Sequence, residues 1–157
     1  MLQAAGDLGT RVHAAIDAFI LGQEPVLDAD TKQGYDNFRK WLDESGIKIL
    51  KGDTYIANLE LGFGGAMDAL GEKDGKLIML DWKTGNSLQD TASLQSSAYS
   101  IAFEDTFGEP INDGYVCRFG KEIPGDIEPK RVNMANAKSA FISALNLKNK
   151  MGQTLWI

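Results

Sequence analysis

One segment of the chain is apolar on both faces of a strand, and it limits the possible folds more than any other. Residues 77–83 read Leu-Ile-Met-Leu-Asp-Trp-Lys. Because side chains alternate between the faces of a strand, the even positions give one apolar face and the first two odd positions give another. A strand of this kind lies in the centre of a sheet that is covered on both sides. We therefore expect an α/β domain with helices packed on the sheet.

The remaining pattern predicts helices first, then consecutive strands, then helix and strand again. We expect helices over residues 10–21, 29–44, 88–107 and 136–147. We expect strands over 47–50, 54–61, 63–70, 76–82, 114–119 and 127–132, with a five-residue hairpin turn at 71–75. This order indicates one domain over residues 1–157, with a mixed central β-sheet that contains an antiparallel meander flanked by helices.

Composition excludes several classes of protein. The 157 residues are 43% hydrophobic and 24% charged, which is typical of a globular domain. A net charge of −6 argues against a basic coat that binds nucleic acid nonspecifically. No apolar run approaches the ~20 residues of a membrane span, and the N-terminus lacks the features of a signal peptide. With Cys117 as the only cysteine, a disulfide or four-cysteine iron–sulfur cluster within the chain is excluded, so we expect a cytoplasmic protein without membrane contact.

Two carboxylates and one lysine are predicted to meet on one face of the sheet. Asp81 and Lys83 are two residues apart at the end of the central strand, so they share a face. If the hairpin pairs Leu70 with about Leu77, Asp68 lies on that face too. Adjacent carboxylates repel unless a proton or a cation lies between them, and their oxygens suit Mg²⁺ or Mn²⁺. The lysine would then hold an attacking water or offset charge in the transition state of phosphodiester hydrolysis.

These residues resemble the signature of the PD-(D/E)XK nucleases. Asp68 and the run Asp81-Trp82-Lys83 lie on successive strands of a hairpin, with Met67 where that family usually has proline. Three further features resemble the RecB-type exonuclease branch, which includes mitochondrial genome-maintenance and phage exonucleases. They are the glycine-to-histidine run 9–13, Glu60 on the preceding strand, and the Q-x-x-x-Y run 95–99.

The resemblance implies a restriction-endonuclease-like core and a metal-dependent deoxyribonuclease. It implies an exonuclease that acts on DNA ends or single strands in recombination, repair or replication, in a bacterial or phage-infected cell. It implies Mg²⁺ or Mn²⁺ as cofactor and DNA as partner, and it leaves an oligomer open. ATP is not expected, because the chain has no Walker A loop.

The same resemblance implies roles for particular residues. Catalytic roles fall to Asp68, Asp81, Lys83, His13, Glu60 and Gln95. Contacts to substrate fall to Tyr99 and Thr84. Metal ligation falls to Asp68, Asp81, His13, Glu60 and Trp82.

Two other functions stay open at this point. A structure-specific or restriction-type endonuclease would use the same core. A nonenzymatic nucleic-acid-binding module would keep the fold but would usually have lost one of Asp68, Asp81 and Lys83, and the sequence retains all three. Taken alone, a lone histidine or an Asp-x-Lys pair is also typical of an ordinary surface.

Overall fold

The computed structural model describes residues 2–151, and side chains from residue 7 onward. Within that range the elements are α1 (Leu2–Ile20), α2 (Ala29–Ser45), β1 (Lys48–Asn58), β2 (Phe63–Lys73), β3 (Lys76–Lys83), α3 (Thr91–Phe107), β4 (Gly114–Phe119), β5 (Ile127–Arg131) and α4 (Met134–Met151). The sheet has the order β1-β2-β3-β4-β5. Only β3 and β4 are parallel among these neighbours. The predicted mixed sheet with an antiparallel meander is confirmed.

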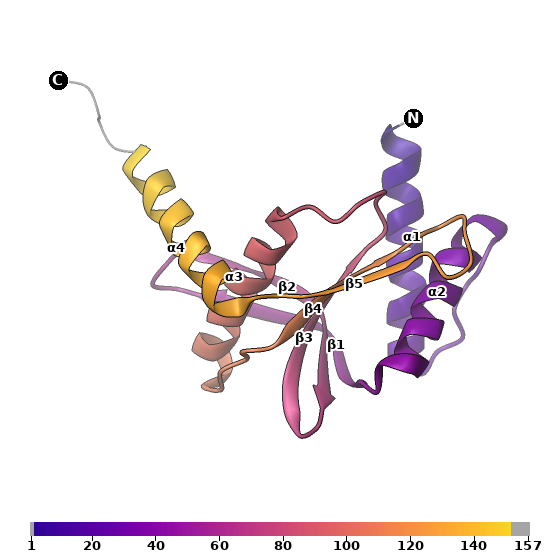
Figure 1. Cartoon of the computed structure of the whole chain (residues 1–157), viewed down its shortest axis with the longest axis horizontal. Coiled ribbons are helices and arrows are strands. Elements are labelled where there is room, and N and C mark those ends of the chain that lie inside the picture. The colour runs from indigo at the N-terminus through magenta and orange to yellow at the C-terminus, as the bar shows by residue number, and fades with distance from the viewer. Residues whose placement is uncertain (1, 152–157) are drawn as a thin grey trace.

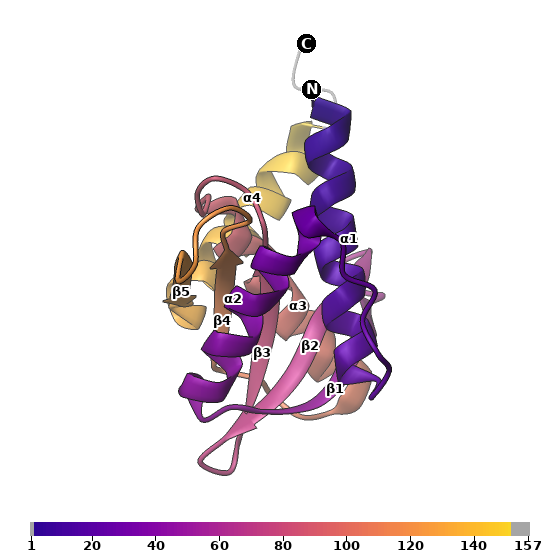
Figure 2. The same cartoon turned by 90° about the vertical axis from the view of Figure 1, so that its right-hand side faces the viewer.

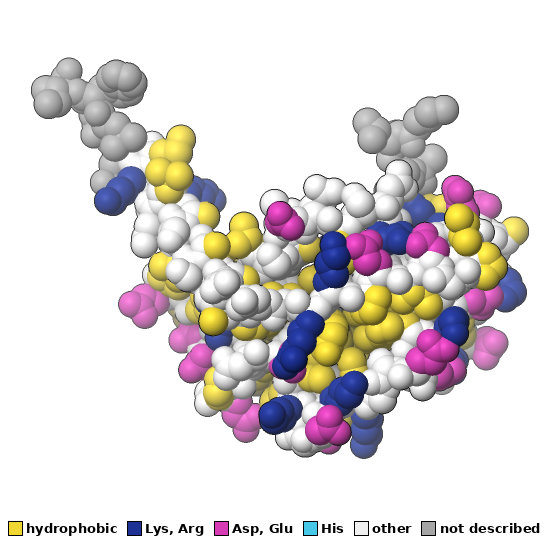
Figure 3. Space-filling model, viewed as in Figure 1, with side chains coloured by type: hydrophobic (Ala, Val, Ile, Leu, Met, Phe, Trp, Pro, Cys, Tyr) yellow, Lys and Arg dark blue, Asp and Glu magenta, His cyan; other side chains and the backbone are white. Residues whose placement is uncertain are grey.

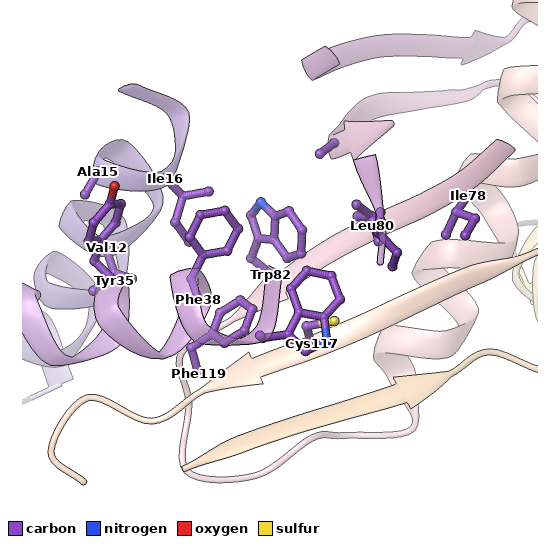
Figure 4. Close-up of a cluster of buried hydrophobic side chains, with 13 residues drawn as sticks. Val12, Ala15, Ile16, Tyr35, Phe38, Ile78, Leu80, Trp82, Cys117 and Phe119 are labelled. Atoms are coloured by element: carbon purple, nitrogen blue, oxygen red, sulfur yellow. The ribbon is translucent and has the colours of Figure 1, made fainter. Parts of the chain in front are cut away.

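Helices cover both faces of the sheet, with α1 and α2 on one side and α3 and α4 on the other (Figures 1 and 2). On the first side, Trp82 is 0% exposed and its ring packs against Phe38 and Phe119, with centroids 5.5 Å and 5.8 Å away (Figure 4). On the second side, Met79 of β3 packs in a cluster with Phe103 of α3. The central strand is therefore apolar on both faces, as its sequence predicts.

Several element boundaries differ from the expectation, among them the last helix, which spans Met134–Met151 and not 136–147. The first helix begins at Leu2, before the expected residue 10, and the third begins at Thr91 after a loop rather than at residue 88. The two strands expected over 47–61 form a single strand, β1, with a β-bulge between Ile49 and Lys51. No helix within residues 2–151 has the length and apolar character needed to cross a membrane.

The β2–β3 hairpin closes on two residues, so the expected five-residue turn over 71–75 is wrong. Lys73 pairs with Lys76, and the turn residues Asp74 and Gly75 have φ of 52° and 72°. Left-handed backbone at both positions matches the twist of the two strands, and an Asp-Gly pair adopts it readily.

The register of the hairpin nevertheless preserves the expected face of each side chain. Glu72 lies opposite Leu77, two residues further along β2 than expected. Because side chains alternate with a period of two, a shift of two residues leaves every side chain on its expected face. Asp68 therefore shares a face with Asp81 and Lys83.

Candidate active site

The backbone pairing of β2 and β3 ends at the candidate site. Beyond the last backbone pair, the carboxylate of Asp68 accepts a hydrogen bond from β3. The backbone pairing ends with Ala69 opposite Leu80. One step further, Asp68 Oδ2 accepts a hydrogen bond of 2.6 Å from the backbone N–H of Trp82. The preceding residue, Met67, packs in the hydrophobic cluster that includes buried side chains of α3. Asp68 is therefore fixed beside the end of β3 while β2 diverges from it.

Asp81 is an acid whose charge is only partly compensated. Its side chain is 5% exposed, and Lys83 Nζ lies 2.7 Å from its Oδ2. Within the described residues this ammonium is the ion-pair partner of the oxygen. Burial raises the pKa of Asp81 to about 6, and the carboxylate of Asp68 adds to that rise while Lys83 opposes it. Burial raises the pKa of Asp68 as well.

A chain of hydrogen bonds leads from β3 to α3. Lys83 Nζ donates to Gln95 Oε1 at 3.1 Å, and Gln95 Nε2 donates to the Tyr99 hydroxyl at 3.0 Å. Gln95 and Tyr99 lie one turn apart on the same face of the helix. The ring of Tyr99 in turn lies against Gly65 of β2, where an added Cβ would be 2.8 Å from the ring. The glycine therefore sets the position of the tyrosine that orients the amide and, through it, the ammonium.

Gly65→Ala should lower the rate of DNA cleavage about tenfold or more, because displacing the ring misplaces the chain of hydrogen bonds that ends at Lys83. The measurement is the single-turnover rate of the variant, with thermal melting as a check on the fold. In a chain that already carries Tyr99→Ala, the glycine substitution should cost nothing further. An equal loss in both backgrounds would show that Gly65 acts by another route.

Helix α1 approaches the end of β3 through a glycine. A Cβ at Gly9 would lie 2.7 Å from Thr84 Oγ1, so only glycine allows this approach without a shift. One turn later, His13 Nδ1 lies 3.9 Å from Asp68 Oδ1. Burial lowers the pKa of His13, which favours a neutral imidazole that can bind a cation or a water. The spacing of Gly9 and His13 thus has a geometric reason. Gly9 permits the close contact of α1 with Thr84, and this contact brings His13 to Asp68.

Two acids near Asp68, Asp17 and Asp53, were not predicted. Asp17 follows His13 by one helical turn, and burial raises its pKa to about 6, with the charge of Asp53 adding to the rise. Asp53 lies opposite Asp68 in the β1–β2 register, with a φ of 22° directly after Gly52. The four-residue spacing from His13 is a signal for Asp17. The position of Asp53 depends on the register of β1, which the sequence does not reveal.

The expectation that Glu60 lies on a strand beside Asp68 is wrong. Glu60 is exposed in the turn between β1 and β2. Asn58 begins this turn, since its Oδ1 accepts a hydrogen bond of 2.7 Å from the N–H of Leu61, and Gly62 ends it with a φ of 73°. About 16 Å of extended strand separates the turn from Asp68. The structure therefore does not bring Glu60 to the other predicted site residues.

The side chain of Trp82 is also absent from the site. Its indole points into the aromatic cluster on the opposite face of the sheet (Figure 4). Its backbone N–H is taken by the carboxylate of Asp68. The indole lies on the opposite face, as alternation predicts, so ligation by Trp82 stays a prediction for its backbone, whose N–H positions Asp68.

The donor set nevertheless has the chemistry of a site for a hard divalent cation. Across residues 2–151, no three His, Cys, Asp or Glu side chains are gathered as a ready metal centre. The side chains of the neighbouring carboxylates Asp68 and Asp81 are 23% and 5% exposed, and the charge of Asp68 adds to the raised pKa of Asp81. A cation would relieve their repulsion, and carboxylate oxygens with a nearby imidazole suit Mg²⁺ or Mn²⁺.

A cavity of about 450 Å³ opens beside Lys83 and Gln95. Its other walls come from the loop after β3 and the first turn of α3, and they are Gly85, Ser87, Gln89, Thr91 and Ala92. Lys83 carries the single formal charge among these lining residues. The cavity therefore gives a negatively charged substrate access to the ammonium.

The chain is similar to known proteins over part or most of its length. No family model matches it. The chain is 31% identical over 81 residues to human mitochondrial genome maintenance exonuclease 1, and this match covers 48% of the chain and 23% of the human protein. A candidate exonuclease from Eubacterium rectale superposes with a TM-score of 0.64 at 14% identity, over 92% of this chain and 65% of that one. An alkaline exonuclease from Laribacter hongkongensis gives a TM-score of 0.43 at 15% identity, over 91% and 84%.

The chain shares its α/β fold with the Eubacterium rectale structure. The likeness to the human exonuclease is limited to 81 residues, and it agrees with the resemblance that the sequence motifs suggest. The chain spans about a quarter of the length of that human protein and about two thirds of the Eubacterium rectale chain, at 23% and 65%.

Proposed function

We propose that this domain hydrolyses the phosphodiester bonds of DNA with Mg²⁺ or Mn²⁺, as an exonuclease that acts on ends or single strands in recombination, repair or replication. The observation that carries the proposal is the grouping of Asp68, Asp81 and Lys83 where β2 and β3 part, with Lys83 Nζ 2.7 Å from Asp81 Oδ2. Two incompletely compensated carboxylates beside a lysine suit cation-assisted chemistry on a phosphate. The likeness to a human exonuclease supports the same reaction.

Each side chain has a role that follows from its contacts. Asp68 and Asp81 would hold the cation, and His13 would act as a further ligand or accept a hydrogen bond from the attacking water. The cation, when bound, supplies a Lewis acid for the phosphate. Lys83 holds the water or offsets developing charge, and Gln95 keeps the ammonium in place through the 3.1 Å hydrogen bond. Thr84 and Tyr99, which flank the cluster, would contact the DNA.

Incubation of circular and linear DNA, each single- and double-stranded, with Mg²⁺ tests this function. We expect loss of the linear forms alone, and no cleavage in excess EDTA, because the carboxylates need a cation between them to act on a phosphate. Full activity in EDTA would contradict the role of the carboxylates. Nicking of circles would identify an endonuclease on this core, and binding without cleavage of any form would identify a nonenzymatic module.

A further inference from the structure

The cavity beside Lys83 is the first of several that adjoin one another along β5. It shares Gln89 and Ala92 with a second cavity, which reaches Lys130 and Arg131. The two cavities therefore meet at the first turn of α3. A ligand that leaves Lys83 in this direction passes onto the last residues of β5.

Two more cavities extend the path. Arg131 lines a third cavity of about 490 Å³, which also touches Lys138, and a fourth of about 340 Å³, which ends at Lys76. Asn112 lines both of these as well. We call the four adjoining cavities from Lys83 to Lys76 the β5 trough.

The β5 trough concentrates positive charge on a chain whose net charge is −6. Its acidic lining residues are Asp90 and Asp113. Figure 3 shows Lys and Arg side chains in a column across this face, over β5 and down toward the β2–β3 hairpin. The cationic lining residues, five of the 16 Lys and Arg in the chain, are Lys76, Lys83, Lys130, Arg131 and Lys138.

The cations of β5 are accessible to an anion. Arg131 binds Asp113 at 2.8 Å and Lys130 lies 2.9 Å from Glu128, with the two cationic side chains 67% and 62% exposed. The single contact between Lys130 and Glu128 is of the kind that contributes about 0–1 kcal/mol, whereas Arg131 holds Asp113 through two hydrogen bonds of 2.8 Å. A phosphate can therefore replace Glu128 at Lys130 at little cost, and it can approach the exposed side of the Arg131 guanidinium.

The edge of β5 does not suit another protein strand. Pro129 has no backbone N–H to donate, and Lys130 and Arg131 beside it are exposed charges. Proline and charge on an edge strand block pairing with a second sheet. The exposed backbone of β5 is therefore not a docking edge, and the side chains of the trough decide what it binds.

The lining of the β5 trough matches the backbone of a polynucleotide. No aromatic side chain is among the described residues that line it, so it offers bases no surface for stacking. Its cations alternate with the amides and hydroxyl of Asn112, Asn133 and Ser93, which are groups that bind phosphate and sugar. We infer that the β5 trough holds the phosphate backbone of a DNA strand, independently of sequence, whose reacting bond lies at Lys83. This inference rests on the proposed function for the assignment of DNA and of the reacting end.

The double substitution Lys130→Gln/Lys138→Gln tests the trough. The matched control is Lys32→Gln/Lys40→Gln on α2, where both lysines are exposed and paired with carboxylates. Affinity for a fluorescent single-stranded oligonucleotide of roughly 20 nucleotides is measured by anisotropy in EDTA, between about 50 and 200 mM salt. We expect the trough pair to bind about tenfold more weakly at low salt and to lower the slope of log Kd against log salt by about 1.4. The control pair should match the parent, and thermal melting checks that both fold.

Equal affinities and slopes for the two double variants would overturn the trough. Cleavage by the parent is followed in parallel with Mg²⁺ or Mn²⁺, so the two proposals can fail separately. A parent that cleaves linear DNA while the trough pair behaves as the control retains the proposed function alone. A parent that binds through the trough but cleaves no DNA retains the trough alone. A parent that binds no oligonucleotide at low salt overturns the trough, and the cleavage assay then decides the proposed function separately.

Discussion

Lys83→Ala should slow DNA cleavage by at least ~10²-fold, the size expected when a contact made in the transition state is lost. Lys83 Nζ lies 2.7 Å from Asp81 and 3.1 Å from Gln95, so the ammonium is held at the point where charge develops on the phosphate. Affinity for Mg²⁺ and DNA should stay within several-fold of the parent, because the carboxylates remain. Single-turnover rates and equilibrium binding separate these two effects.

The control for this experiment is Lys40→Ala, which removes an exposed lysine from α2. It should leave the rate unchanged. Melting temperatures are needed for Lys83→Ala, because Asp81 loses its ion-pair partner. Near-normal turnover in a folded Lys83→Ala variant would overturn the assignment of the strand motif.

Asp81→Asn should abolish cation-dependent cleavage and also change how stability depends on pH. Burial raises the pKa of Asp81 from 3.8 to about 6 in the folded state. Between those pH values the folded protein binds more protons than the unfolded chain, so this group makes the free energy of unfolding fall as pH rises. Asparagine does not titrate. From pH ~4 to pH ~7 the variant should therefore gain up to about 3 kcal/mol relative to the parent.

Denaturant unfolding of both proteins over this pH range measures the effect. Adding Mg²⁺ at neutral pH should stabilise the parent, because a cation that binds the folded state alone shifts the equilibrium toward it. The variant should show little of this stabilisation. Parallel pH curves for the two proteins would contradict a buried carboxylate at this position, and equal stabilisation by Mg²⁺ would place the cation elsewhere.

The grouping of Asp68, Asp81 and Lys83 could be predicted because it depends on parity alone. The expected turn was too long, but the real register differs by two residues, and alternation has a period of two. The central position of β3 could be predicted equally well, since both of its faces are apolar. Such features survive errors in the exact boundaries of strands.

Glu60 and Asp53 could not be placed because their positions depend on irregular backbone. Glu60 lies in a turn that the side chain of Asn58 begins, and Asp53 follows a bulge in β1. Alternation gives no information across such interruptions. Gly9 is also unfavourable in a helix, by about 1 kcal/mol relative to alanine, so the sequence predicts that the helix begins after it. In the structure α1 continues through Gly9, and the contact with Thr84 explains why this position has no side chain.

The carboxylate that ends the β2–β3 ladder serves both architecture and chemistry. Without it the backbone N–H of Trp82 would lose its acceptor, whereas loss of Lys83 or His13 would leave the ladder intact. A descendant of this domain that had given up catalysis but still folded would therefore keep an acceptor at position 68, and it would lose Lys83 together with the acid at position 81, which would otherwise be buried without its ion-pair partner. In a search for inactive copies, the absence of Lys83 is therefore more informative than the presence of Asp68, because the fold itself favours an acceptor at position 68.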